Sequence, residues 1–187
     1  MVFRSLVKQM IWYAIGHGEN KFLRSFTEME KFEIRKAKQK DKKDILKIFE
    51  SYKPNHWDIK PANEHFTRFF ESGDFPHDEF FVGLIKKRIV SVIGYYHDLA
   101  NETGWLEWFY THKDYNHRGI GKRMFNFVVS ELKARKAKKL FVNTSSHLFY
   151  KSAVIFYQKM GFRKVDVLND YYEDGEDKII MSRNLDG

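Results

Sequence analysis

The feature that most constrains this chain is a short segment in which a β-type run passes into a helix through two glycines. Residues 105–110, WLEWFY, are apolar and aromatic, and apolar residues then recur at helical spacing from Ile120 to Leu132. Gly119 and Gly121 therefore lie where the helix begins. Glycine permits unusual dihedrals and close approach of a ligand, while the first N–H groups of a helix and the positive end of its dipole favour an anion. The segment predicts a phosphate cradle.

A Gly-x-Gly spacing alone carries little information. At about 7% glycine, a chain of 187 residues contains about one such pair by chance. Gly16 and Gly18 form a second pair, with no convincing strand before it and no long periodic helix after it. We predict a loop there, because the flanking pattern separates the two pairs.

The composition indicates one packed domain. A length of 187 residues allows a sizeable core, and 43% hydrophobic with 17% aromatic residues argues against disorder. The chain has no cysteine, which excludes disulfides, thiolate metal sites and a cysteine nucleophile. No apolar run reaches the ~18 residues of a membrane span. We expect a soluble, cytoplasmic protein.

The net charge of +8 raises the question of a nucleic-acid partner. Most lysines, however, alternate with acidic residues, as in residues 38–44. This pattern is typical of solvated helix faces, so the sequence argues against nucleic acid. An anionic cofactor would benefit from the same excess of charge.

Residues 1–30 stand apart as an N-terminal extension, ahead of one domain over residues 31–187. Apolar residues recur at helical spacing within residues 2–14, with basic residues opposite and no acidic residue before Glu19. Four interpretations stay open: docking on the domain or a second subunit, lying on a membrane surface, targeting, or extension upstream of a functional start at Met29. No cleavage pattern follows, so docking or extension is favoured.

The domain is predicted to follow the order β-α-α-β-β-β-α-β-α-β-β. Asp41 and Asp44 are expected to cap the first helix, and Gly73 to end the second. The predicted elements are strand 32–35, helices around 41–52 and 61–73, strands 79–85, 89–97 and 104–111, the helix begun at Gly119, strand 140–144, helix 149–160, and strands 162–168 and 177–183.

Three blocks in this order resemble the GNAT-type N-acetyltransferases. Residues 116–121, NHRGIG, are similar to the acetyl-CoA signature Gln/Arg-x-x-Gly-x-Gly/Ala, although Asn116 departs from its first position. Residues 153–162, AVIFYQKMGF, are similar to the family's Ala-x-x-Phe-Tyr-x-x-x-Gly-Phe helix, with Tyr150 where asparagine is frequent. Residues 169–181 resemble the loop and last strand of several members, including peptide N-terminal acetyltransferases.

The resemblance covers residues 32–185 and implies an α/β fold, a three-layer α/β/α arrangement with a splayed mixed sheet. It implies that the pantetheine arm of acetyl-CoA inserts between the strand ending at Thr111 and the strand at residues 140–144. Backbone groups of residues 109–111 would bind the arm, and N–H groups of residues 116–122 would hold the pyrophosphate. The implied cofactor residues are Phe109, Tyr110, Thr111, Asn116, His117, Arg118, Gly119, Ile120, Gly121, Lys122, Ser152 and Tyr157.

The resemblance also implies a general acid. Tyr157 matches the position whose hydroxyl lies near the cofactor sulfur, where it can protonate the departing thiolate. A phenol of pKa near 10 holds its proton at neutral pH, and transfer to a thiolate of pKa near 8.5 is only moderately uphill. The alternative is a core role, since apolar residues surround Tyr157 at helical spacing.

Glu107 is the candidate base, because a primary amine is mostly protonated at pH 7 and must lose a proton before it attacks. Strand alternation would place Glu107 on one face with Phe109 and Thr111, and Tyr110 on the other. If the first face lines the acceptor cleft, Glu107 is placed for base catalysis. A salt-bridge or edge carboxylate is the alternative.

Tyr171 and Tyr172 are the candidate acceptor-binding residues. Acidic residues follow them in an otherwise basic chain, and in the resembling enzymes this loop covers the acceptor site, so its carboxylates would attract a cationic amine. The alternative is an ordinary hairpin turn at Asp174 and Gly175.

Ser145, Ser146 and His147 follow a strand end, and we interpret them as capping residues and not as a nucleophilic triad. The remaining histidines show no metal-ligand spacing, so no metal is expected.

The sequence thus predicts an acetyl-CoA-dependent N-acetyltransferase that transfers the acetyl group directly to a primary amine of a peptide, a protein or a small molecule. The alternative is a non-catalytic module on the same fold that senses acyl-CoA or binds nucleic acid. A homodimer is an open expectation, suggested by sheet edges and the N-terminal apolar stripe.

Overall fold

The computed structural model describes residues 32–53 and 58–186. The predicted extension at residues 1–30 lies outside the described residues, so its four interpretations stay open. The helices are α3 (Lys42–Glu50), α4 (Ile59–Thr67), α5 (Ile120–Ala134) and α6 (Lys151–Lys159), with the short turns η1 (Gln39–Asp41), η2 (Arg68–Ser72), η3 (Lys113–Tyr115) and η4 (Leu148–Tyr150). The strands are β1 (Glu33–Lys36), β2 (Asp78–Ile85), β3 (Arg88–Asp98), β4 (Thr103–Thr111), β5 (Lys139–Ser145), β6 (Arg163–Glu173) and β7 (Glu176–Asn184).

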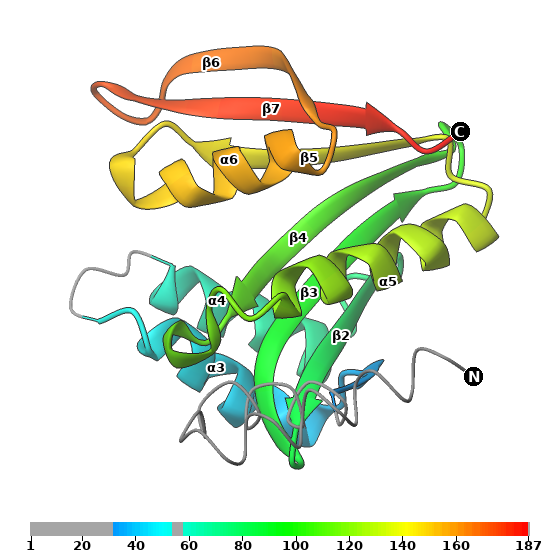
Figure 1. Cartoon of the computed structure of the whole chain (residues 1–187), viewed down its shortest axis with the longest axis vertical. Coiled ribbons are helices and arrows are strands. Elements are labelled where there is room, and N and C mark those ends of the chain that lie inside the picture. The colour runs from blue at the N-terminus through cyan, green and yellow to red at the C-terminus, as the bar shows by residue number, and fades with distance from the viewer. Residues whose placement is uncertain (1–31, 54–57, 187) are drawn as a thin grey trace, which may run out of the picture.

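The strands form one mixed sheet in the order β1-β2-β3-β4-β5-β7-β6. All neighbours are antiparallel except β4 and β5, which pair in parallel only where Thr103–Trp105 meets Lys139–Phe141. Beyond that short ladder the two strands separate, and the opening between them is plain in Figure 1. The expected splayed mixed sheet is therefore present.

Helices cover both faces of the sheet, as three layers require. One buried cluster includes Phe81, Leu106, Met124 and Leu132 and lies between the sheet and α5. The other includes Phe49, Phe66 and further side chains between the sheet and α3 and α4. Each helix buries one apolar stripe, which explains the helical spacing of these residues.

The element order agrees with the prediction, and the differences are local. Asp41 precedes α3, but its carboxylate does not cap that helix. It accepts hydrogen bonds from the Lys38 N–H at 2.8 Å and from the Arg35 guanidinium, because the charged fork of Arg35 provides the stronger donors. β6 also runs five residues past the expected Leu168, through a register shift beside Asp170, whose φ is 51°.

No helix in the two described ranges is long and apolar enough to cross a membrane.

Candidate active site

A bulge in β4 decides which side chains face which layer. The register against β3 shifts between Val92 and Gly94, and Trp108 has φ of 42°. Trp108 and Tyr110 pack with the α3 and α4 cluster, whereas Phe109 packs with the α5 and α6 cluster. The alternation expected from the sequence is therefore wrong here, because a bulge inserts an extra residue and reverses the parity beyond it.

The predicted cradle lies beside the opening between β4 and β5. After η3 the backbone passes through His117 with φ of 60° and Gly119 with φ of 75°, and α5 begins at Ile120. The first N–H groups of α5 have no acceptor within the helix, and the positive end of the dipole lies there. The local geometry is that of an anion site.

Gly121 keeps the floor of this cradle open. A methyl group added there would meet the Phe109 ring at 3.6 Å and the Phe156 ring at 3.9 Å, which are ordinary contacts. The protein's own packing therefore does not require glycine at this position. Glycine at this position leaves the backbone open to close approach.

The side chains around the cradle are directed to other partners. The Asn116 amide donates to the Tyr52 hydroxyl at 2.9 Å, and Arg118 donates to the Asp114 carbonyl at 2.8 Å. Arg123 lies over the Phe32 ring at 4.7 Å, so its charge is turned toward β1. The Arg123 charge is therefore directed away from the cradle.

The strand end next to the cradle is held by side chains from elsewhere. Tyr52 donates to the Thr111 carbonyl at 2.6 Å, and Ser91 donates to the Tyr110 carbonyl at 2.7 Å. On its other edge, β4 pairs with β5 no further than Trp105. Backbone groups on that edge of Phe109 and its neighbours thus border the opening.

Tyr157 lies in α6, which starts on the far side of the opening. Its side chain is 7% exposed, and its ring packs against Phe156 at 5.7 Å and Phe162 at 5.5 Å. Burial raises the pKa of the phenol well above its ordinary value, so the hydroxyl keeps its proton at neutral pH. Ser152, near the start of α6, is exposed.

A polar cluster at the mouth of the opening was missed by the sequence reasoning. Tyr110 from β4 and Tyr150 from η4 both donate to Oδ2 of Asp58, the latter at 2.8 Å. Burial and the Asp58 charge raise the pKa of both tyrosines. Asp58 precedes α4 and belongs to no motif. In the sequence, the cluster was indicated only by Tyr150, which stands where the family frequently has asparagine.

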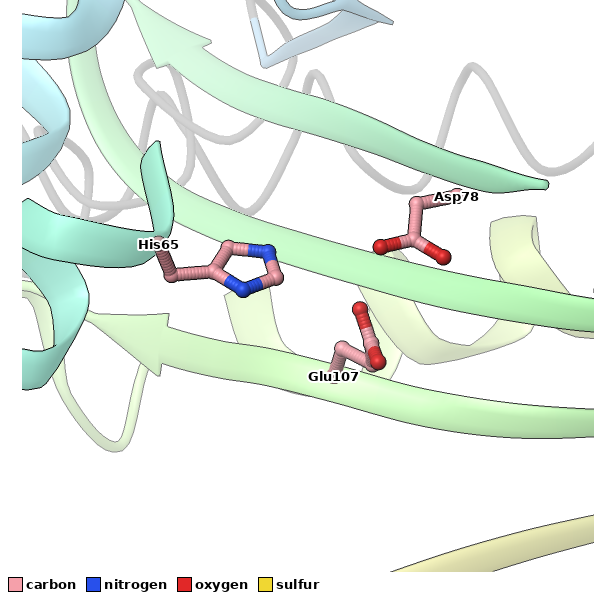
Figure 2. Close-up of side chains that lie close together, drawn as sticks. All are labelled: His65, Asp78 and Glu107. Carbon is pink, nitrogen blue, oxygen red and sulfur yellow. The ribbon is translucent and has the colours of Figure 1, made fainter. Parts of the chain in front are cut away.

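Glu107 lies on the α4 side of the sheet, with Asp78 from β2 and His65 from α4 (Figure 2). One ligand-type atom from each of the three side chains lies within 4.8 Å of the other two. Burial, together with the neighbouring Asp78 carboxylate, raises the pKa of Glu107 to about 8. Glu107 thus shares a face with Tyr110, not with Phe109 as expected.

The acidic segment after Tyr171 and Tyr172 is the far end of the β6–β7 hairpin. The two tyrosines are 53% and 48% exposed, and their rings meet edge to face at 5.0 Å. The turn falls at Asp174 and Gly175, as the hairpin interpretation predicts. Burial raises the pKa of Tyr172, with smaller contributions from Tyr171 and from the charge of Asp58.

The polar residues at and just after the end of β5 make structural hydrogen bonds. His147 Nδ1 accepts a hydrogen bond from the Phe149 N–H at 3.1 Å and caps η4. Ser145 donates to Glu176 and accepts from the His147 N–H at 2.8 Å, while Ser146 accepts from the Asp177 N–H at 2.8 Å. These bonds tie the β5 end to the β6–β7 hairpin.

Comparison with known proteins identifies the fold family. Residues 42–162 match the model of the acetyltransferase (GNAT) family. A curated N-alpha-acetyltransferase from Saccharolobus solfataricus is 30% identical over 74 residues, which are 39% of this chain and 43% of that protein. The match thus spans less than half of that relative's length.

Solved structures with this fold align over most of both chains. A structure assigned to the GNAT family from Desulfovibrio desulfuricans is 23% identical, with a TM-score of 0.73, and 82% of this chain covers 99% of that one. The ribosomal-protein-S18-alanine N-acetyltransferase of Escherichia coli is 18% identical, with a TM-score of 0.67 and coverage of 82% and 94%. An aminoglycoside 6'-N-acetyltransferase complexed with coenzyme A is 16% identical, with a TM-score of 0.67 and coverage of 83% and 98%.

The family model matches most of the domain, and the structure has the splayed sheet and the glycine-started helix. The chain therefore belongs to the GNAT family of acetyltransferases, which use acetyl-CoA.

Proposed function

We propose that this protein transfers an acetyl group from acetyl-CoA directly to a primary amine, without a covalent enzyme intermediate. The observation that carries the proposal is the opening between β4 and β5, with the cradle of α5 on one side and the buried Tyr157 of α6 on the other. An anion site, a slot and a protonated phenol in one place match the needs of thioester aminolysis.

Acetyl-CoA would supply the activated acetyl group and the anchoring phosphates. N–H groups of residues 116–122 would hold the pyrophosphate, which does not depend on the side chain of Asn116. The β4 edge at residues 109–111 would bind the pantetheine arm, and one N–H there would support the oxyanion. Ser152, exposed near the start of α6, would contact the cofactor from the other side.

Tyr157 and Glu107 are the proposed acid and base. The ammonium gives up one proton toward Glu107, and the nitrogen lone pair attacks the thioester carbonyl. The C–S bond then breaks as the thiolate takes the proton of Tyr157, and the second N–H proton of the attacking amine restores the phenol as the amide forms. The raised pKa of Glu107, about 8, supports this role because it lies close to the ~7.7–8.0 of an α-amine.

The acceptor would enter at the mouth of the opening, beside Asp58 and the tip of the β6–β7 hairpin. The Asp58 carboxylate, and Glu176 beside Ser145, would attract a cationic amine. Tyr171 and Tyr172 would form the outer wall. The relatives named above act on a protein N-terminus or an aminoglycoside, so a peptide or a small-molecule amine fits this class.

The experiment that tests the proposal has two stages. Calorimetry with acetyl-CoA should show one site, and thiol release should then appear with at least one member of a panel of peptide, polyamine and aminoglycoside amines. Binding without turnover on any amine would favour an acyl-CoA sensor, an alternative supported by the atypical Asn116 and Tyr150. Salt-dependent nucleic-acid binding that is indifferent to coenzyme A would contradict both. Cytoplasmic location and a homodimer stay predictions.

A further inference from the structure

Three side chains that are distant in the sequence converge above β3. Asp78 is the first residue of β2, Glu107 lies in β4, and His65 comes from α4, which covers this face (Figure 2). Between the two carboxylate strands, β3 presents Gly94, which pairs with Phe80 on one side and Glu107 on the other. A Cβ at Gly94 would come within 2.2 Å of the Phe80 ring, so this glycine makes room for Phe80, whose ring meets that of His65 edge to face.

Aromatic packing, and not hydrogen bonding, holds the His65 ring. The ring stacks on Phe75 at 4.6 Å and meets Phe66, Phe80 and Trp108 at 5.4 to 5.6 Å. Burial lowers the pKa of His65 to about 4, with a smaller contribution from Arg68, so the imidazole is neutral at pH 7. Its Nε2 is buried without a hydrogen-bond partner.

Glu107 also has an unpartnered atom. Its Oε2 is buried and has no hydrogen-bond donor. Two carboxylates in such a setting resist ionising together, because burial removes much of the solvent that would stabilise the second charge. Among the residues that the structure describes, His77 lies next to Asp78 and its charge partly offsets the rise that burial gives the pKa of that carboxyl, while Arg68 ion-pairs with Asp74 at 3.0 Å. Uptake of one proton by the pair relieves the repulsion between its charges, so the two carboxylates together accept a proton more readily than an isolated carboxylate does.

A metal ion would need a different geometry. A tetrahedral ion with ~2.0–2.1 Å bonds brings its ligand atoms to about 3.3 Å from one another. The ligand-type atoms of the three groups lie within 4.8 Å of one another, and the four rings packed around His65 oppose movement of its imidazole toward the carboxylates. A proton bridging the carboxyls requires no such movement.

We propose that Asp78 is a positioning residue that makes Glu107 a stronger proton acceptor, by sharing through a hydrogen bond the proton that Glu107 takes from the acceptor amine. The inference rests on the proposed role of Glu107 as base. In the step, the N–H bond of the ammonium breaks and an O–H bond forms on Glu107, which later returns the proton to solvent. The neutral His65 closes the pair from the α4 side and adds no competing positive charge.

The negative charge of Asp78 raises the proton affinity of Glu107 from that of an ordinary carboxylate toward that of an amine. An isolated carboxylate of pKa near 4.3 would take a proton from an α-amine only at a large free-energy cost. The pairing therefore makes the free energies of the proton on the amine and on Glu107 nearly equal. The acid limb of the pH–activity profile would then report the protonation of Glu107.

Asp78→Asn tests the inference, because asparagine keeps the shape and removes the charge. The direct measurement is a ¹³C-carboxyl NMR titration of glutamate-labelled protein, in which Glu107→Gln identifies the Glu107 signal. We expect Asp78→Asn to lower the Glu107 midpoint by about one pH unit. The acid limb of kcat/KM should move in parallel. Asp166→Asn, which removes an exposed carboxylate on β6 at the other edge of the sheet, should leave the midpoint in place.

The outcomes separate the two claims. An unchanged Glu107 midpoint in a folded Asp78→Asn variant would overturn the pairing. So would stoichiometric Zn²⁺ binding to the wild-type protein that is lost in His65→Gln, since the cluster would then be a metal site. If the midpoint shifts but Glu107→Gln keeps full turnover, the pairing holds and the base role of Glu107 is wrong.

Discussion

The hydroxyl of Tyr150 donates a 2.8 Å hydrogen bond to Oδ2 of Asp58, a residue 92 positions earlier in the chain. Tyr110, on the other strand side of the opening, donates to the same oxygen. One carboxylate therefore joins both walls of the proposed acceptor entrance. The sequence signalled this relationship only as a departure from a family pattern at Tyr150.

Replacing Asp58 with asparagine should weaken acceptor binding and leave acetyl-CoA binding unchanged. The amide keeps the size of the side chain but removes the charge that attracts an ammonium group. We expect the acceptor KM to rise about tenfold, the effect of losing one partly desolvated charge contact of ~1.4 kcal/mol. Steady-state kinetics on the amine found in the panel measure this change. An unchanged KM with a cationic acceptor would contradict a cation subsite at Asp58.

Gly121→Ala should lower the affinity for acetyl-CoA with little effect on stability. The added methyl group makes only ordinary contacts within the protein, but it would occupy space next to the cradle backbone. We expect a loss of at least about tenfold in affinity by calorimetry, with thermal unfolding close to wild type.

Gly119→Ala is the matched comparison, because Gly119 has φ of 75°. A side chain there is strained, so this variant should lose about 1 kcal/mol of unfolding free energy. Equal stability losses in the two glycine variants would argue against a ligand as the reason for Gly121.

Tyr157→Phe should lower kcat by roughly a hundredfold while the fold is kept. The buried ring packing with Phe156 and Phe162 does not need the hydroxyl, and burial keeps that hydroxyl protonated by raising its pKa. Turnover with a saturating acceptor, together with a melting curve, separates chemistry from folding. Wild-type turnover would leave Tyr157 with the core role alone.

Because His65 is buried as a neutral ring, we expect the free energy of unfolding to fall in mild acid. Burial lowers its folded pKa to about 4, below the unfolded value of 6.5, so folding favours the neutral ring. This stability is fully present above pH 6.5 and is lost as the pH falls from 6.5 toward 4. Its size is roughly 1 to 2 kcal/mol after allowance for partial exposure.

Denaturant titrations of wild type and His65→Gln at several pH values measure this contribution. The difference in unfolding free energy between the two proteins should change between pH 7 and pH 4.5. His117→Gln, at an exposed histidine, serves as the reference for the pH dependence of a histidine-to-glutamine replacement. A constant difference for His65→Gln would mean that the ring titrates equally in the folded and unfolded states.

Local patterns were enough to predict the elements of this fold. The helix that starts at Gly119 follows from a glycine before an apolar stripe, and the β2–β3 hairpin follows from two β-rich runs around Lys86 and Lys87. The family and its splayed sheet were likewise predictable, since their motifs are contiguous. These features depend on interactions between residues a few positions apart, and such residues can be read from the sequence alone.

The composition of the site was decided by the tertiary structure. The positive φ of Trp108 moved Glu107 to a different face from Phe109, because a bulge reverses strand parity without a clear sequence signal. Asp58 and Asp78 became site residues only through contacts with β4, far away along the chain. The sequence by itself determined an acetyltransferase fold with an anion cradle. Only packing of α4 and the strands across the sheet decided which carboxylates meet, and so how the proposed base and acceptor entrance are built.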